Sequence, residues 1–290
     1  MYTIVAASQK GGSGKTTLSG HLAVEAVRQG AGEIALIDTD PQGSLAHWWN
    51  ARQAPAPHFV KAGLPDLENA LADLERMGIR IAVIDTPPAI TQSISRVVAY
   101  ADLVIVPTRP SPHDLRAVGA TVDIAERHGK PLIFVVNAAT ARARITGESA
   151  VALSQHGTVA PVTIHHRVDF AASMIDGRTV GEVVPNSQSA KEITELWLYI
   201  QEKLSRIVRD PGLLPDVRAE HLAINALLSS GVEGAVDILP PVLEQPLYDG
   251  PERRSAGERR LILEPRLHER RAFGRRATDL PPVGSHWGSK

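Results

Sequence analysis

Short runs of apolar residues recur along the first two-thirds of the chain, and most of them end at a Gly, Pro, Asp or Asn. Continuous apolar runs without polar alternation are typical of strands buried on both faces of a parallel sheet. The run at 58–61 follows a Pro-rich loop and predicts a strand at the edge of that sheet. The predicted strands are residues 2–7, 33–37, 58–61, 80–84, 101–107, 132–136 and 159–164.

Amphipathic stretches separate these runs, with apolar residues every three or four positions, as on one face of a helix. Ser111 and Thr146 are suited to cap two of the helices. The alternation predicts an α/β fold class: a doubly wound, mainly parallel sheet with helices on both faces, followed by an irregular C-terminal extension. The predicted helices are residues 18–28, 44–50, 64–77, 112–129, 146–153 and 189–208.

A glycine-rich segment joins the first predicted strand to the first predicted helix. Such a turn directs successive backbone N–H groups into one concavity at the positive end of a helix dipole, where nucleotide phosphates bind. A lysine there contacts the β- and γ-phosphates, and the following threonine hydroxyl completes a Mg²⁺ shell. The candidate phosphate-binding residues are Lys10, Gly11, Gly12, Ser13, Gly14, Lys15, Thr16 and Thr17.

Carboxylates follow two of the other predicted strands. Asp38 and Asp40 come after strand 33–37, and Asp85 comes after strand 80–84. Because ligands bind at the carboxyl ends of parallel strands, these groups suit a metal shell and the positioning of an attacking water. Asp85 is expected across from Thr16, where it can hold a Mg²⁺ water. A plain turn is the alternative reading of the segment that contains Asp38 and Asp40.

The phosphate loop departs from the strict P-loop pattern, which asks for glycine where the chain has Gln9. With Lys10 in front, it resembles instead the deviant Walker A box of the ParA/MinD group of P-loop ATPases. The order of the three motifs resembles the ParA-type partition ATPases over residues 1–208, in the short form without an N-terminal helix-turn-helix domain. The resemblance implies ATP and Mg²⁺ as cofactors and an ATP-dependent homodimer.

The resemblance also implies roles for single residues. Lys15 stabilises the transferred phosphoryl group, and Asp40 positions water. Lys10 reaches across the dimer to the partner's nucleotide, and Asn137, at the end of strand 132–136, reads the adenine base. An asparagine is also a common residue at the end of a strand, so this last role has a plain structural alternative. The metal ligands implied are Thr16, Asp38 and Asp85.

Composition narrows the class further. The chain has 290 residues, of which 43% are hydrophobic, and it has no cysteine. The absence of cysteine excludes disulfides, thiolate zinc sites and cysteine-ligated iron–sulfur clusters, and with them the iron–sulfur branches of the same superfamily. Neither a secretory signal nor an apolar run long enough to span a membrane is present, so we expect a cytoplasmic protein without stable membrane association.

Charge is distributed unevenly along the chain. Residues 251–290 carry a net charge of +5 and residues 1–250 a net charge of −6. Arg pairs begin at positions 253, 259, 270 and 275, which predicts a flexible basic arm that binds DNA phosphates; a solubilising tail is the alternative. Residues 209–250, with one possible helix at 217–228, are expected to be a weakly structured linker.

Together with these features, the resemblance implies an ATPase that dimerises on ATP, binds DNA non-specifically on the nucleoid and hydrolyses ATP slowly. Its expected task is to position a plasmid or chromosome locus with a ParB-like centromere-binding partner. Two alternatives share the same motifs: a membrane-associated positioning ATPase similar to MinD, and an ATPase that positions a protein cargo over the nucleoid. The motifs do not separate the three.

Overall fold

The computed structural model describes residues 1–88 and 91–207. Within them, seven strands form one sheet in the order β3-β2-β4-β1-β5-β6-β7, and every neighbouring pair is parallel. The edge position predicted for residues 58–61 is confirmed. The strands are β1 (Tyr2–Ala6), β2 (Ile34–Asp38), β3 (His58–Lys61), β4 (Ile81–Asp85), β5 (Leu103–Thr108), β6 (Leu132–Val136) and β7 (Thr158–Val159).

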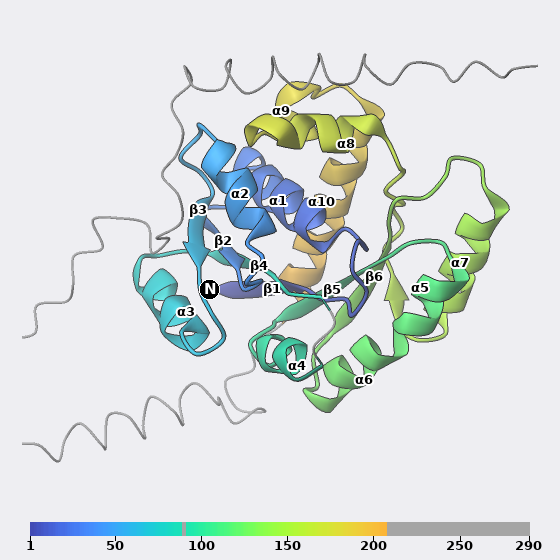
Figure 1. Cartoon of the computed structure of the whole chain (residues 1–290), viewed down its shortest axis with the longest axis horizontal. Coiled ribbons are helices and arrows are strands. Elements are labelled where there is room, and N and C mark those ends of the chain that lie inside the picture. Colours follow the sequence, from blue (N-terminus) through green and yellow to red (C-terminus); the bar gives the residue numbers. More distant parts are fainter. Residues whose placement is uncertain (89–90, 208–290) are drawn as a thin grey trace, which may run out of the picture. The chain divides into compact units, whose positions relative to one another are not determined.

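Helices cover both faces of the sheet, which confirms the doubly wound α/β class (Figure 1). Helices α1, α2, α8, α9 and α10 pack on one face, and α3, α4, α6 and α7 pack on the other. The helices are α1 (Lys15–Arg28), α2 (Ser44–Ala51), α3 (Leu67–Arg76), α4 (Thr91–Ala99), α5 (Pro112–Ala117), α6 (Gly119–Arg127), α7 (Arg144–Ser154), α8 (Val168–Ser173), η1 (Met174–Asp176), α9 (Val180–Val183) and α10 (Gln188–Arg206).

The register of the central strands brings the sequence motifs to one edge. Asp38, the last residue of β2, is the register partner of Asp85 on β4, and Asp85 is also the partner of Ala6 on β1. The phosphate loop leaves β1 at this same point. In a doubly wound sheet, this edge is where ligands bind.

Three predicted elements differ from the structure. The helix expected at 112–129 is divided into α5 and α6 beside Gly119, a residue that weakens a helix interior. The strand expected at 159–164 is regular only over Thr158–Val159, because Pro161 has no N–H to donate and interrupts the ladder; the Ile164 N–H bonds to β6 again, at the Val136 carbonyl. Thr146 is not an N-cap: α7 begins earlier, with an ion pair between Arg144 and Glu148 across its first turn.

Two further points concern the helices. Ser111 caps α5 as predicted, because its side chain accepts a hydrogen bond from the Asp114 N–H. Helix α4 has no counterpart in the predictions.

In the described part of the chain, no helix combines the length and apolar character of a membrane span. The predictions for the linker and the Arg-rich arm lie outside the described residues.

Candidate nucleotide-binding site

The phosphate loop connects β1 to the N-terminus of α1 and depends on two of its three glycines for its shape. Gly12 has φ +72° and Gly14 has φ +100°, a region that other residues adopt at a cost. Gly11 is different, since a Cβ there would meet only Pro88, at 4.0 Å. Gly14 is also the N-cap residue of α1, so the loop ends at the positive end of the helix dipole.

Lys15 lies buried at the centre of the loop. Its Nζ donates to the carbonyl oxygen of Ser8 at 3.1 Å, and in the described residues it forms no ion pair with a carboxylate. Burial lowers the pKa of the Lys15 amine, while the charges of Asp85 and Asp40 act in the opposite direction. A buried ammonium without an anionic partner fits a site that takes phosphate.

Thr16 and Asp85 face each other across the gap between α1 and β4. The Thr16 hydroxyl donates to Asp85 Oδ2 at 2.6 Å. Burial raises the pKa of Asp85 to about 7, so the free carboxylate is held at a cost. A hydroxyl oxygen and a carboxylate oxygen are hard ligands of the kind that Mg²⁺ prefers. A Mg²⁺ ion here would stabilise the ionised form of the buried Asp85 carboxylate.

Two threonines that the sequence did not single out join the strand ends. Thr86 Oγ1 donates to the Ala6 carbonyl at 2.8 Å, and Thr39 Oγ1 donates to the Asp85 carbonyl at 2.7 Å. These bonds hold the carboxyl ends of β1, β2 and β4 together. The sequence carried a signal for these threonines, because Asp38 and Asp85, each the last residue of its strand, are both followed directly by threonine.

Asp38 and Asp40 make contacts typical of a turn. Asp38 accepts from the backbone N–H of Asp40 at 2.9 Å and from that of Ala46 at 3.0 Å, and burial raises its pKa. Asp40 accepts from the Gln42 N–H at 2.9 Å and stays partly exposed. The two carboxylates therefore shape the β2–α2 loop, and Asp40 lies close enough to Lys15 for their charges to interact.

Lys10 stands at the rim of the loop and is bound to its own chain. Its Nζ donates to Asp114 Oδ2 at 2.5 Å; Lys10 is 38% exposed and Asp114 only 5%. Burial alone would raise the pKa of Asp114, but the hydrogen bonds from Lys10 and Ser111 bring it below its ordinary value. Arg109 is a second cation here, with its guanidinium 3.7 Å from where a Cβ on Gly12 would lie.

The remaining predicted residues, Asn137 and Thr17, lie next to the phosphate loop. Asn137 is 7% exposed, and its Nδ2 donates to the Ser13 carbonyl at 2.7 Å. Thr17 is in the first turn of α1, where its carbonyl accepts a hydrogen bond from His21. The structure thus brings all the predicted site residues to the carboxyl edge of the sheet, and it adds Thr39, Thr86, Arg109 and Asp114 to them.

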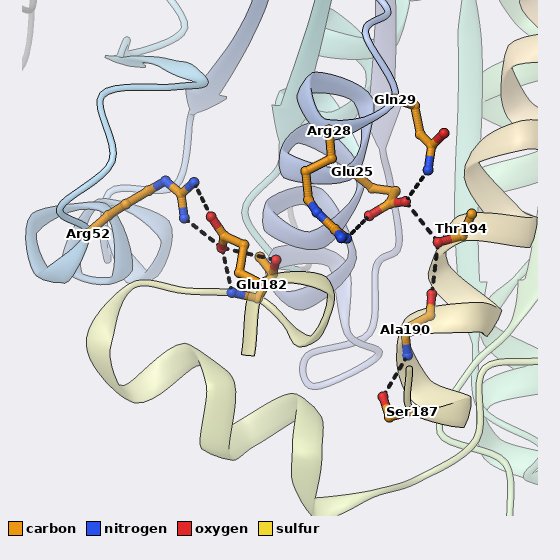
Figure 2. A network of polar contacts seen from close by, with 9 residues as sticks. Glu25, Arg28, Gln29, Arg52, Glu182, Ser187, Ala190 and Thr194 are labelled. Atoms are coloured by element: carbon orange, nitrogen blue, oxygen red, sulfur yellow. Dashed lines mark hydrogen bonds and ion pairs between the residues drawn. The ribbon is translucent and has the colours of Figure 1, made fainter. Parts of the chain in front are cut away.

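A polar network connects α1 and the end of α2 to the C-terminal helices α9 and α10 (Figure 2). The Arg52 guanidinium forms two hydrogen bonds with the Glu182 carboxylate, at 2.9 and 2.7 Å, and a third with the Gly177 carbonyl. Glu25 of α1 pairs with Arg28 and accepts from Thr194 of α10 at 2.8 Å. The helix that begins at the phosphate loop is therefore fixed to the C-terminal helices of the domain.

A parallel α/β sheet with a glycine loop, a buried lysine and a Thr–Asp pair at one edge defines a nucleotide-binding ATPase of the P-loop class. The chain belongs to the family described as the CobQ/CobB/MinD/ParA nucleotide binding domain, which matches residues 4–180. The description of the family is a nucleotide-binding domain, and two solved structures with this fold hold ATP and Mg-ADP, the cofactors that the sequence predicted. Members of this family are P-loop ATPases, as the sequence predicted.

Relatives within the family have different names. "Maintenance of carboxysome distribution protein A" of Halothiobacillus neapolitanus is 27% identical over 66% of this chain and 92% of its own length. "Protein ParA" of Rhizobium radiobacter is 30% identical over 42% of this chain and 53% of its own length.

Solved structures share the fold at low identity. The Cyanothece McdA(D38A)–ATP complex has a TM-score of 0.57 and 18% identity, over 71% of this chain and 96% of that one. MinD from Pyrococcus horikoshii with Mg-ADP has a TM-score of 0.60 and 14% identity, over 72% of this chain and 99% of that one.

Proposed function

We propose that this chain is an ATP-driven positioning ATPase, which dimerises on ATP, binds DNA without sequence preference and hydrolyses ATP slowly until a partner protein stimulates it. The observation that carries this proposal is the pair of lysines at the phosphate loop. Lys15 is buried inside the loop, whereas Lys10 is held at its rim by a single ion pair with Asp114. From this position Lys10 can leave Asp114 and bind the phosphates of the nucleotide that a second copy of the chain holds.

Each site residue has a role in this proposal. Thr16, Asp38 and Asp85 would hold a Mg²⁺ ion or its waters, and the ion would supply positive charge to the phosphates of the nucleotide. Lys15 neutralises the phosphates, and Asp40 orients the attacking water. Lys10 completes the charge around the γ-phosphate in the partner subunit, so that hydrolysis is confined to the dimer.

The first test is the oligomeric state. Light scattering of full-length protein should give a dimer with ATP and Mg²⁺ and a monomer with ADP and Mg²⁺. Asp40→Ala should retain ATP binding, lose hydrolysis and accumulate as the dimer. Lys10→Ala should stay monomeric, whereas Lys191→Ala, which removes an exposed lysine of α10, should behave as the wild type. One mass for all proteins and both nucleotides would refute ATP-dependent dimerisation.

For the cargo, we propose a protein assembly carried over the nucleoid. The supporting finding is coverage: the alignment spans 92% of the relative named for carboxysome distribution, against 53% of the ParA relative. Segregation of a plasmid or chromosome locus through a ParB-like partner is the second candidate, since relatives named ParA also match. Fluorescent tracking in cells that carry Lys15→Ala distinguishes them, because the true cargo loses its regular spacing and the other does not.

DNA binding is proposed for the basic arm at residues 251–290. Each phosphate contact contributes about −0.9 to the slope of log K against log salt, so replacing the four Arg pairs with Ala should flatten that slope on a random duplex. Basal ATPase activity should not change. Coincident slopes for the two proteins would assign DNA binding to the folded domain.

Flotation with anionic vesicles tests the MinD-like alternative. We expect no enrichment of the protein in the vesicle fraction.

A further inference from the structure

The side chain of Asn137 supports the phosphate loop from behind. Asn137 directly follows β6, and its backbone N–H donates to the Thr108 carbonyl at 2.8 Å, which fixes the residue at the sheet edge. Its Nδ2 donates to the Ser13 carbonyl at 2.7 Å, and the bond is buried. Since β6 is separated from β1 by β5, this is a long-range contact from a neighbouring part of the sheet into the loop.

The chemistry of the partner dictates how the amide is oriented. A carbonyl oxygen only accepts, so the Asn137 amide must turn its NH₂ group toward Ser13; the flipped amide would set two acceptors against each other. The amide also packs directly over Gly14. A Cβ on Gly14 would lie 2.1 Å from Nδ2 and 3.3 Å from Cγ. Glycine is therefore required at position 14 both by its φ and by the space that Asn137 occupies.

The bond to Ser13 also fixes the direction of the next N–H group. In a trans peptide the C=O and the N–H point to opposite sides of the chain. Holding the Ser13 carbonyl toward Asn137 therefore turns the Gly14 N–H away from Asn137. Gly14 is the N-cap residue of α1, and its carbonyl accepts the Leu18 N–H at 2.9 Å. The orientation of the peptide that begins the helix thus depends on Asn137.

We propose that Asn137 is a positioning residue that sets the conformation of the phosphate loop, and thereby the affinity for the polyphosphate of any nucleotide, instead of reading adenine. One donor of its amide is committed to Ser13, and this buried bond holds the amide in the orientation that supports the loop. The role rests only on nucleotide binding by this loop. It is independent of the proposed dimer, DNA binding and cargo.

Calorimetric titration of the full-length protein with three ligands tests this role. The ligands are ATP, GTP and inorganic tripolyphosphate, each with Mg²⁺. Asn137→Ala removes the donor and leaves the Ser13 carbonyl unsatisfied, which should weaken all three by about tenfold and leave the ratio of ATP to GTP affinity unchanged. Ser173→Ala is the matched control: it removes another buried hydrogen bond to a carbonyl, in α8, and should change none of the three affinities.

A second variant covers a failure of the first to fold. Asn137→Asp keeps the shape of the side chain but sets an acceptor against the Ser13 carbonyl, so it should weaken the three ligands at least as much. Without ligand, amide hydrogen exchange should accelerate in the peptide that spans residues 8–18 and remain unchanged in α10. A loss confined to ATP, with tripolyphosphate unaffected, would show that Asn137 reads the base. Unchanged affinities for all three ligands would also overturn the role.

Discussion

The histidine behind the phosphate loop makes folding stability depend on pH. His21 is buried on α1, and its Nδ1–H donates to the Thr17 carbonyl at 2.8 Å. Nε2 is buried, and no described residue forms a hydrogen bond with it. The ring packs edge-on against Phe170, with the ring centroids 5.3 Å apart. Protonation would therefore place a charged N–H where it has no acceptor.

The size of the effect follows from the pKa. Burial lowers the pKa of His21 from 6.5 to about 4, and the charges of Glu182 and Glu25 oppose this only in part. The unfolded chain binds a proton near pH 6.5 while the folded protein stays neutral, so stability is full above that pH and is lost as the pH falls toward 4. The loss is about 1.4 kcal/mol per pH unit below pH 6.5 and close to zero above it, so it sums to about 2 kcal/mol between about pH 7.5 and pH 5.

Urea denaturation at a series of pH values measures this loss. His21→Leu removes the titration with a side chain of similar size, and carboxylates that titrate in both proteins cancel in the comparison. The free energy of unfolding of the wild type should fall by about 2 kcal/mol more than that of the variant over this pH range. Parallel curves for the two proteins would show that the buried His21 does not control the pH dependence.

Three other predictions follow from the ion pairs and the phosphate loop. Lys15→Ala should abolish the rise in melting temperature on adding ATP, since the buried cation is gone; an undiminished rise would contradict its phosphate role. Asp114→Asn should release Lys10 and raise the fraction of dimer at limiting ATP, as light scattering would show; an unchanged or smaller fraction would mean that Asp114 instead orients Lys10 productively. Arg52→Leu should cost about 3 kcal/mol in urea denaturation, because it leaves the Glu182 carboxylate unpaired, and adding Glu182→Gln should recover part of it. No recovery would indicate lost packing as the cause.

The features that the sequence predicted correctly are local ones. Apolar runs predicted the six longer strands, because a strand buried on both faces leaves a continuous apolar signal. The phosphate loop was readable because its glycines supply backbone angles that other residues avoid, and two of the three have those angles. Where a local rule was overlooked, as with Pro161 in the last strand, the prediction failed.

Contacts between distant residues were decided by the tertiary structure alone. Lys10 and Asp114 are 104 positions apart, Ser13 and Asn137 are 124 apart, and Arg52 and Glu182 are 130 apart. No periodicity or spacing encodes such pairs, since they meet only after the sheet has set the order and register of its strands. The sequence by itself therefore determined the class of fold and the phosphate loop. The partners of Lys10 and Asn137 came from strand order, because the loops after β5 and β6 meet the phosphate loop only at the shared carboxyl edge of the sheet.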